Sequence, residues 1–381
     1  MINVPTLRFK EFKSPWISSS IEQISKVYDG THQTPNYKKN GVKFVSVENI
    51  NDLYSSKKFI SVNDYERNFK VKPTISNIFI TRIGDIGTPS LISENEPLAY
   101  YVSLALLKIN KINPSFLYHY IQTQYFQKEL WKRTLHVAFP KKINKNEIGE
   151  CKVFYPNSID EQAKIAIFLG CLEKRIVVQN KIISKYESLI KGIRHHVFGS
   201  ICGEKQSSLG SFLEEYSEKN VANNLQSVAV GKYGIRKREE IYSKELSADY
   251  SKNKVIRKDT LIIGMGSTQI DIGILTTDDC YCVSPAYTTY RIKGVNSFYL
   301  QEHLIELNPL LSVRYMITSA RQGKAVNKED LMKHLMTIHS ENEQKEICQC
   351  FENLYSRLQI EKEMLLALQK QKAFLLQSMF I

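Results

Sequence analysis

The chain has 381 residues, which is too long for one ordinary core, so two domains with connecting elements are expected. Apolar residues make up 43% and charged residues 24%, a composition that excludes a largely disordered chain. The 52 lysines and arginines exceed the 39 acidic residues and leave a net charge of +13, which favours a polyanionic partner, nucleic acid before an anionic membrane surface.

No apolar run is long enough to span a membrane, and the N-terminal stretch lacks the apolar core of a signal peptide, so a cytoplasmic protein is expected. Seven cysteines are scattered along the chain without a matching cluster of histidines or cysteines at zinc-site spacing. They are interpreted as reduced thiols, and no metal site is predicted.

The first globular segment, residues 1–157, contains the strand patterns "GVKFVSVENI" and "NIFITRI" and a helical pattern near 116–131. The turn-rich loop from Gly30 to Gly41 and the basic loop "AFPKKINK" offer groups that bind base edges and phosphates. Either loop alone is more typical of a solvated surface. The candidate DNA-binding residues of this segment are His32, Gln33, Thr34, Tyr37, Lys38, Lys39, Arg82, Lys141 and Lys142.

A long helix is predicted over 158–199. Ser158 and Glu161 form an S-x-x-E capping box, and apolar residues then recur with a heptad period and a widened stripe. At 1.5 Å per residue its helical part, from about 160 to 198, is about 57 Å long and must bury its stripe against another helix.

The second globular segment, residues 200–339, repeats the first faintly. "IRKDTLIIGMGSTQIDIG" resembles "KPTISNIFITRIGDIG", "KAVNKEDL" resembles "KINKNEI", the strand pattern "AYTTYRI" recurs, and a helix is predicted near 298–311. Basic loops lie in the corresponding places, which favours a binding role over a solvated surface. The candidate DNA-binding residues here are Lys232, Tyr233, Arg236, Lys237, Arg238, Ser267, Gln269, Arg321, Gln322 and Lys324.

A second long helix, over 340–381, opens with "SENEQKEI", nearly the same phrase as "SIDEQAKI" half a chain earlier. The two helices carry the same stripe and are predicted to pair as a coiled coil. The stripe is interrupted at Arg175 and Gln179, and again at Arg357 and Glu361. The two arginines are either exposed at the edge of the seam or fix its register. The residues predicted for the helix-pair interface or for docking of a partner are Ile165, Phe168, Leu172, Arg175, Ile176, Tyr186, Ile347, Phe351, Leu354, Arg357, Leu358 and Leu368.

The motifs of enzymes are incomplete. "TPNY" lacks the first acceptor side chain and the second proline of the [ND]PP[YF] tetrad of amino-methyltransferases, and "IIGMGS" lacks the third glycine of a dinucleotide loop. No G-x-x-x-x-G-K-[ST] phosphate loop occurs. We therefore predict no catalytic residues and no cofactor bound by this chain.

The chain resembles the specificity subunits of type I restriction–modification systems. The opening "VPTLRFKEFKSPW", the two helix openings "DEQAKIAIFLGCLEKRI" and "NEQKEICQCFENLYSRL", and the endings "HHVF" and "QSMF" carry the likeness. The resemblance implies an α+β fold: two mixed α/β target-recognition domains, 1–157 and 200–339, separated by two long antiparallel coiled-coil helices, 158–199 and 340–381, with a pseudo-two-fold internal repeat.

The resemblance also implies a non-catalytic subunit that reads a split, asymmetric target in double-stranded DNA. Two methyltransferase subunits and motor-nuclease subunits would be its partners, and they would carry S-adenosylmethionine, ATP and Mg²⁺. The assembled complex would be an adenine-specific DNA methyltransferase and an ATP-dependent endonuclease. Two alternatives stay open: a self-sufficient methyltransferase or nuclease with diverged motifs, and a coiled-coil adaptor without a DNA role.

Overall fold

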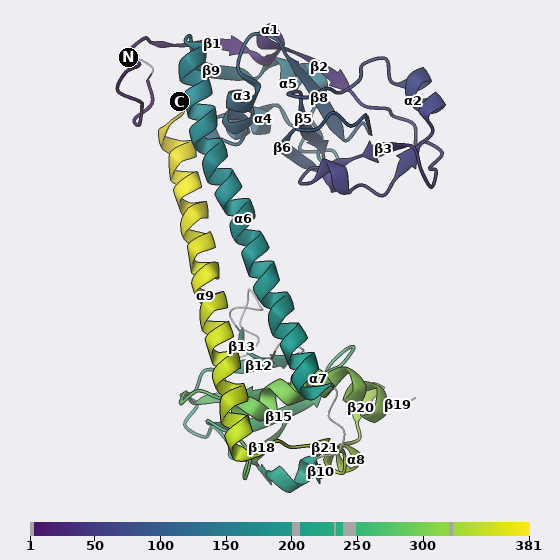
Figure 1. The fold of residues 1–381 in the computed structure, drawn as a ribbon, viewed down its shortest axis with the longest axis vertical. Helices are drawn as coiled ribbons and strands as arrows, with labels where there is room; N and C mark the ends of the chain where they lie inside the picture. The colour runs from purple at the N-terminus through teal and green to yellow at the C-terminus, as the bar shows by residue number, and fades with distance from the viewer. Residues whose placement is uncertain (1–3, 200–205, 232–233, 239–248, 320–322) are drawn as a thin grey trace. The chain divides into compact units, whose positions relative to one another are not determined.

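The computed structural model describes residues 4–199, 206–231, 234–238, 249–319 and 323–381 (Figure 1). The chain divides into two compact units, and each is described by itself. Unit 1 comprises residues 1–181 and 363–381, and unit 2 comprises residues 182–362. The division passes through both long helices, so each unit contains one globular domain and half of each helix.

The domain of unit 1 is built on a four-stranded antiparallel sheet in the order β2-β8-β5-β6. The strands are β2 (Ser25–Asp29), β8 (Leu104–Ile109), β5 (Ile78–Ile83) and β6 (Asp85–Leu91). Side chains alternate between the two faces of a strand, and both faces of this sheet are covered. Ile78 and Ile80 of β5 enter one core, whereas Phe79 between them enters the other.

Each face has its own covering elements. A three-stranded sheet covers the Phe79 face: β4 (Phe59–Ile60), β3 (Val42–Val45) and β7 (Leu98–Tyr100). The opposite face packs on helices and on the paired strands β1 (Trp16–Ser20) and β9 (Lys152–Pro156). Besides its parts of the two long helices, this unit has the α-helices α1 (Ile21–Ile24), α2 (Val62–Asn68), α3 (Pro114–Ile121), α4 (Gln124–Arg133) and α5 (Lys145–Glu150).

The domain of unit 2 repeats this plan, with a four-stranded antiparallel sheet in the order β11-β18-β15-β16. The strands are β11 (Leu213–Tyr216), β18 (Thr288–Ile292), β15 (Thr260–Met265) and β16 (Ile270–Leu275). Leu261 and Ile263 face α7 (Ser297–Tyr315), and Ile262 faces a second core. The predicted strands in both globular segments are confirmed.

Shorter elements complete unit 2. The strands pair as β12 (Val228–Gly231) with β13 (Gly234–Lys237), β14 (Lys254–Ile256) with β17 (Tyr281–Val283), β19 (Met316–Ser319) with β20 (Gly323–Val326), and β10 (Gln206–Ser208) with β21 (Leu335–Thr337). The short helix α8 (Lys328–Met332) begins at Asn327, just as α5 begins at Asn144. The same strand order and the same helix starts confirm the internal repeat.

The two long helices form as predicted, α6 over Ile159–Phe198 and α9 over Glu341–Ser378, and they lie side by side (Figure 1). In unit 2, Glu187 pairs with Lys362 at 3.1 Å, and one heptad later Arg194 bonds Tyr355 at 2.7 Å. The position on α9 falls as the position on α6 rises, so the helices are antiparallel. In unit 1, Leu172 of α6 and Leu368 of α9 belong to one core.

The predicted interface residues fall into three groups. Ile165, Leu172, Phe351, Leu358 and Leu368 are buried, whereas Ile176, Tyr186, Ile347 and Leu354 are half-buried. Phe168 is exposed on α6 and lies outside the buried seam, and its ring contacts Phe9 of the N-terminal segment at 6.0 Å between centroids. Arg175 and Arg357 are exposed, which favours the first of their two interpretations. Gln179, the other polar residue of the first interruption, is buried.

Two helix predictions need correction. The single helix expected near 116–131 is two helices, α3 and α4, because Thr123 ends one and begins the other: its hydroxyl donates to the Tyr120 carbonyl at 2.7 Å and accepts from Phe126 N. The helix expected near 298–311 is longer and runs to Tyr315, through Pro309.

Candidate nucleic-acid interface

In unit 1, three segments meet where β2 and β5 end, at one end of the strands of the four-stranded sheet. We call this place the sheet edge. The loop of residues 30–41 leaves β2, the turn at Gly84 joins β5 to β6, and the loop of residues 135–142 lies against that turn. Gly84 N donates to the Lys141 carbonyl at 2.9 Å. The sheet edge therefore gathers both predicted basic loops of the domain.

The loop of residues 30–41 is held at both ends. Thr31 N donates to the Tyr100 carbonyl at 3.1 Å, and Lys38 N donates to the Phe59 carbonyl at 2.8 Å. At Gly30 a Cβ atom would lie 2.4 Å from the Tyr101 carbonyl oxygen, so only glycine allows this approach. The predicted residues of the loop are exposed: His32, Gln33, Thr34, Tyr37, Lys38 and Lys39.

Tyr37 combines exposure with a fixed position. Its ring meets Phe44 edge-on at 5.7 Å between centroids, and the Lys58 ammonium lies 6.0 Å from the ring centroid. Tyr37 is 46% exposed, so part of the side chain is accessible to a ligand.

Arg82 was wrongly predicted to contact DNA. The side chain is 8% exposed, its Nε donates to the Ile143 carbonyl at 3.0 Å, and its guanidinium pairs with Asp29. Because Asp29 precedes the loop of residues 30–41 and Ile143 follows the loop of residues 135–142, Arg82 ties the two loops together. The sequence places an arginine on a strand but does not reveal that its partners lie inside the domain.

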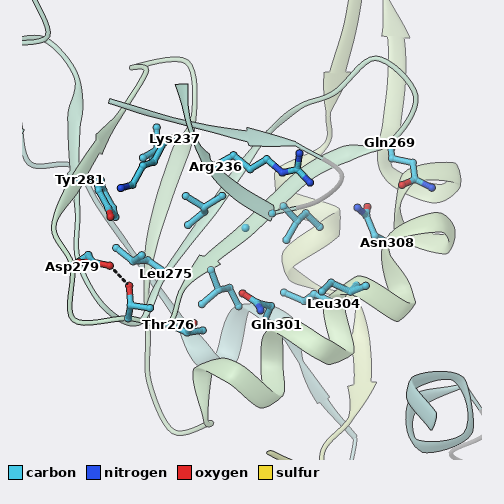
Figure 2. Close-up of a pocket in the computed structure, with 18 of the residues that line it drawn as sticks. Arg236, Lys237, Gln269, Leu275, Thr276, Asp279, Tyr281, Gln301, Leu304 and Asn308 are labelled. Carbon is cyan, nitrogen blue, oxygen red and sulfur yellow. Dashed lines mark hydrogen bonds between the residues drawn. The ribbon is translucent and has the colours of Figure 1, made fainter. Parts of the chain in front are cut away.

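In unit 2, the candidate residues surround a groove of about 780 Å³ below the β12–β13 hairpin. Figure 2 shows Arg236 and Lys237 of β13 on one side and Gln301 and Leu304 of α7 on the other. Gln269, at the start of β16, lines the same groove, with Asp279 and Tyr281 at its far end. The groove thus combines an apolar floor with amide, cationic and carboxylate groups at its rim.

The other candidates of unit 2 are less well placed. Ser267 is exposed in the turn between β15 and β16, and Arg238 follows β13. Lys324 lies in β20, and its side chain is outside the described part of the chain. Lys232, Tyr233, Arg321 and Gln322 also lie outside the described residues.

The helix openings seat each domain on the helix pair through a glutamine. Gln162 Nε2 donates to the Pro156 carbonyl at 2.8 Å, and its Oε1 accepts from Asn113 N at 2.8 Å. Gln344 makes the same two bonds, with the His339 carbonyl at 2.9 Å and Asn296 N at 3.1 Å. Asn113 and Asn296 cap α3 and α7, so the repeated glutamine fixes the same helix in both units.

The glutamate beside it behaves differently in the two units. Glu343 closes a full capping box with Ser340, since Ser340 N donates to its carboxylate at 2.9 Å. Glu161 does not close the predicted box: Arg8 Nε donates to its carboxylate at 2.7 Å, and Trp16 Nε1 donates at 3.3 Å. The N-terminal "LRFKEFKSPW" segment therefore docks on the start of α6.

A polar cluster that the sequence did not predict joins each domain helix to the helix pair. In unit 1, Glu173 lies 2.6 Å from Lys372 Nζ and 3.8 Å from His119 Nδ1 of α3. Burial lowers the pKa of His119 to about 4, so the ring is neutral at pH 7.

In unit 2 the carboxylate lies on the domain helix instead. Glu302 of α7 accepts from Arg194 Nε at 2.9 Å and from Tyr355 Oη at 3.0 Å. Glu302 is 1% exposed, and burial together with this carboxylate raises the pKa of Tyr355 to about 12. Each cluster thus holds a carboxylate and a cation. The carboxylate lies on the helix pair in unit 1 and on the domain helix in unit 2.

An apolar groove of about 750 Å³ lies beside α3 and α6 in unit 1. Ile167 and Val177 of α6 line it and are 68% and 52% exposed. Gly170, between them, has no heavy atom near the place of a Cβ, which leaves the floor of the groove open. Such a helix face is typical of a protein-binding surface.

Two further observations bear on function. Within the described ranges, no three side chains of histidine, cysteine, aspartate or glutamate come together in a way that could hold a metal ion. In the described part of the chain, every helix is too short or too polar to cross a membrane.

Comparisons with known proteins place the whole chain in one architecture. No protein-family model and no curated protein matches it. Among solved structures, the S subunit of a type I restriction–modification system from M. genitalium is 14% identical, with 99% of each chain covered and a TM-score of 0.62. A chain from a structure on the assembly and conformational transition of the type I R-M system is 13% identical, with 96% of this chain and 98% of that chain covered and a TM-score of 0.57. At such identities the likeness establishes the fold alone: this chain has the fold of the S subunits of type I restriction–modification systems.

Proposed function

We propose that this chain is the DNA-reading specificity subunit of a type I restriction–modification complex. Each globular domain binds one half of a split target in double-stranded DNA, and the antiparallel helices hold the two domains at a set separation. Two unlike readers on one stiff spacer bind as a bivalent unit, so two weak contacts yield one selective complex.

The repeat of one domain plan within an S-subunit fold supports this proposal most strongly. Both domains have the same sheet order, and each is held by a glutamine clamp, the pair of hydrogen bonds made by Gln162 or Gln344. Their exposed loops nevertheless differ in sequence. A retained scaffold with different loops is the expected arrangement for two readers of different half-sites. The net charge of +13 fits a DNA ligand.

The groove beside α3 and α6 supports docking of a methyltransferase subunit. Its exposed valines and isoleucine lie on the helix pair and not at the sheet edge that carries the basic loops. In this proposal the two surfaces are separate, so a partner can dock while the loops hold DNA.

The chemistry then belongs to the partners. Two methyltransferase subunits would bind S-adenosylmethionine and flip the target adenine out of the duplex, and motor-nuclease subunits would use ATP and Mg²⁺. This chain would recognise the target sequence and provide the docking surface, and it would bind none of these cofactors itself.

Genome-wide mapping of methylated bases, in cells with and without this chain, tests the proposal directly. We expect a bipartite motif with a constant gap that disappears when the chain is deleted. An unchanged methylation map, in cells that express the methyltransferase subunits, would contradict the proposal.

Exchange of residues 200–338 for the second domain of another S subunit sharpens the test. Only one half of the methylated motif should change. Removal of whole turns in equal number from α6 and α9 should alter the gap and leave both half-sites intact. A change in both half-sites after the domain exchange would rule out independent readers.

Binding assays on the isolated chain separate the alternatives. Contacts to about six phosphates predict that affinity for a duplex falls steeply between low and moderate salt. An adaptor without a DNA role would show no such dependence. A self-sufficient methyltransferase would bind radiolabelled S-adenosylmethionine, whereas we expect no binding by this chain alone.

A further inference from the structure

The loop of residues 135–142 in unit 1 is closed at its base and presents its tip outward. Leu135 N donates to the Lys142 carbonyl at 2.8 Å, and Ile143 N donates to the Arg82 carbonyl at 3.0 Å. The chain enters and leaves the loop at one fixed place on the sheet edge. The tip is therefore held out by a rigid base.

Trp131, near the end of α4, braces the two sides of this loop. The His136 ring lies 4.2 Å from the indole ring, between centroids, and a ring nitrogen of His136 is 2.9 Å from the Trp131 carbonyl oxygen. On the return side, Lys141 Nζ lies 4.6 Å from the centroid of the indole. The indole is 57% exposed, so the brace itself stands at the surface.

Two apolar side chains occupy the tip. Val137 is 99% exposed and Phe139 is 103% exposed, so neither has packed against the domain. Single exposed apolar residues are common and need no explanation. Full exposure of a phenylalanine and a valine two residues apart, on a braced loop, indicates a surface that is covered by a ligand.

The charge around the tip identifies the ligand as polyanionic. The segment from His136 to Lys142 contains no acidic residue and two lysines, Lys141 and Lys142, both exposed. Lys132 of α4 is also exposed, and its ammonium pairs with Glu129 at 2.9 Å. An apolar tip with cations behind it suits a duplex, because the cations meet phosphates while the apolar side chain meets stacked bases.

We propose that Phe139, supported by Val137, is a wedge that enters between two base pairs of the bound duplex, unstacks them and bends the DNA. This inference rests on the proposed DNA-reading function and adds a mode of recognition to it. A wedge selects the sequence that deforms at least cost, so the first domain would favour a flexible pyrimidine–purine step where Phe139 enters.

The bend would belong to one half-site. In the second globular segment the corresponding sequence, Ser319 to Lys324, contains no aromatic or branched apolar residue. That domain therefore has no counterpart of Phe139 in its sequence. The proposed complex bends DNA on one side of the gap.

Selection from a randomised duplex library on the full chain tests the wedge. Wild-type protein should enrich a bipartite motif with a TA or CA step beside the first half-site. Phe139→Ala should keep both half-sites and lose the preference at that step. Phe374→Ala is the matched control, because Phe374 is 60% exposed on α9, and this variant should enrich the wild-type motif with its step.

Energy transfer between dyes at the two ends of the enriched duplex measures the bend. Phe139→Ala should straighten the duplex and bind it about tenfold more weakly, since an aromatic side chain stacked on bases contributes about that factor. The salt dependence of binding should stay unchanged, because the lysines are intact. Equal melting temperatures would show that the fully exposed side chain is not needed for folding.

The outcomes separate the wedge from the function on which it rests. If Phe139→Ala enriches the same step and bends DNA as wild type does, the wedge is overturned while the half-site motif stands. Loss of methyltransferase capture by Phe139→Ala, with unchanged DNA behaviour, would assign the loop to a protein contact and overturn the wedge as well. If wild-type protein enriches no motif at all, both proposals fail together.

Discussion

The polar clusters of the two units differ in which partner carries the acid, whereas the cation lies on the helix pair in both. In unit 1 the acid, Glu173, lies on α6 and faces the neutral His119 of the domain. In unit 2 the acid, Glu302, lies on the domain helix and faces Arg194 of α6. Each domain therefore matches its own end of the helix pair, although the two domains share a topology.

The comparison teaches that the repeat conserves geometry more strictly than chemistry. If the two domains were exchanged, Glu302 would lie beside Glu173. His119 would lie beside Arg194, which would then have no carboxylate partner. Like charges or an uncompensated cation in a buried place are costly, so the clusters disfavour an exchange of the domains.

The largest expected effect follows loss of the buried acid of unit 2. Glu302→Gln removes the charge partner of Arg194, which is 12% exposed, and should lower the free energy of unfolding by about 3–5 kcal/mol. Glu306→Gln, one turn later, is the control: its partner His195 is 71% exposed, so a change below about 1 kcal/mol is expected. Chemical denaturation measures both. Equal effects of the two substitutions would remove the distinction between the buried and the surface pair.

Both units should lose folding stability as the pH falls. Burial lowers the pKa of His303 to about 3, with His339 and His334 adding smaller effects, and lowers the pKa of His119 to about 4 despite the nearby Glu173. Both rings are neutral when folded and take up protons on unfolding. The stability that they contribute is complete above pH 6.5 and is lost as the pH falls toward the folded pKa values.

Each buried histidine should add a slope of up to about 1.4 kcal/mol per pH unit in that window. Denaturation curves between pH 7 and pH 4 measure it. His303→Phe, which keeps the stack on Phe198 at 4.6 Å, should flatten the curve. A variant with the wild-type slope would show that His303 is not the group that takes up the proton.

The glutamine clamps test what the two units hold in common. Gln162→Ala and Gln344→Ala each remove two hydrogen bonds and leave a backbone donor and a carbonyl without these partners. Each should cost about 1–3 kcal/mol, by similar amounts in the two units. Gln349→Ala, on an exposed face of α9, should cost almost nothing. A large difference between the two clamps would break their equivalence.

The smallest expected difference lies at the helix starts. Ser340→Ala removes a full capping box and should cost about 1 kcal/mol, whereas Ser158→Ala removes a single bond of 3.4 Å and should cost about half as much. Amide exchange at Glu343 and Glu161 reports each start. If Ser158→Ala costs more, Glu161 must cap the helix in addition to binding Arg8.

The sequence by itself determined the two long helices and the doubling of the chain. Both depend on local patterns: a heptad stripe read within α6 and α9, a serine at each start, and strand signals of four to six residues. Such patterns predict the structure correctly because the interactions that they specify lie within a few residues of one another. The exposed loop of residues 30–41 was found for the same reason, since turn residues mark it.

Only the tertiary structure decided which side chains face one another. Arg82 left the predicted interface because Asp29 and Ile143, distant in sequence, claim its guanidinium. Phe168 lies outside the helix seam, where its ring contacts Phe9, and Glu161 does not close its capping box because Arg8 binds its carboxylate. Contacts between residues distant in sequence follow no periodic pattern along the chain. A charged residue on a strand or a phenylalanine on a helix therefore has several possible partners, and only the fold brings one of them into contact.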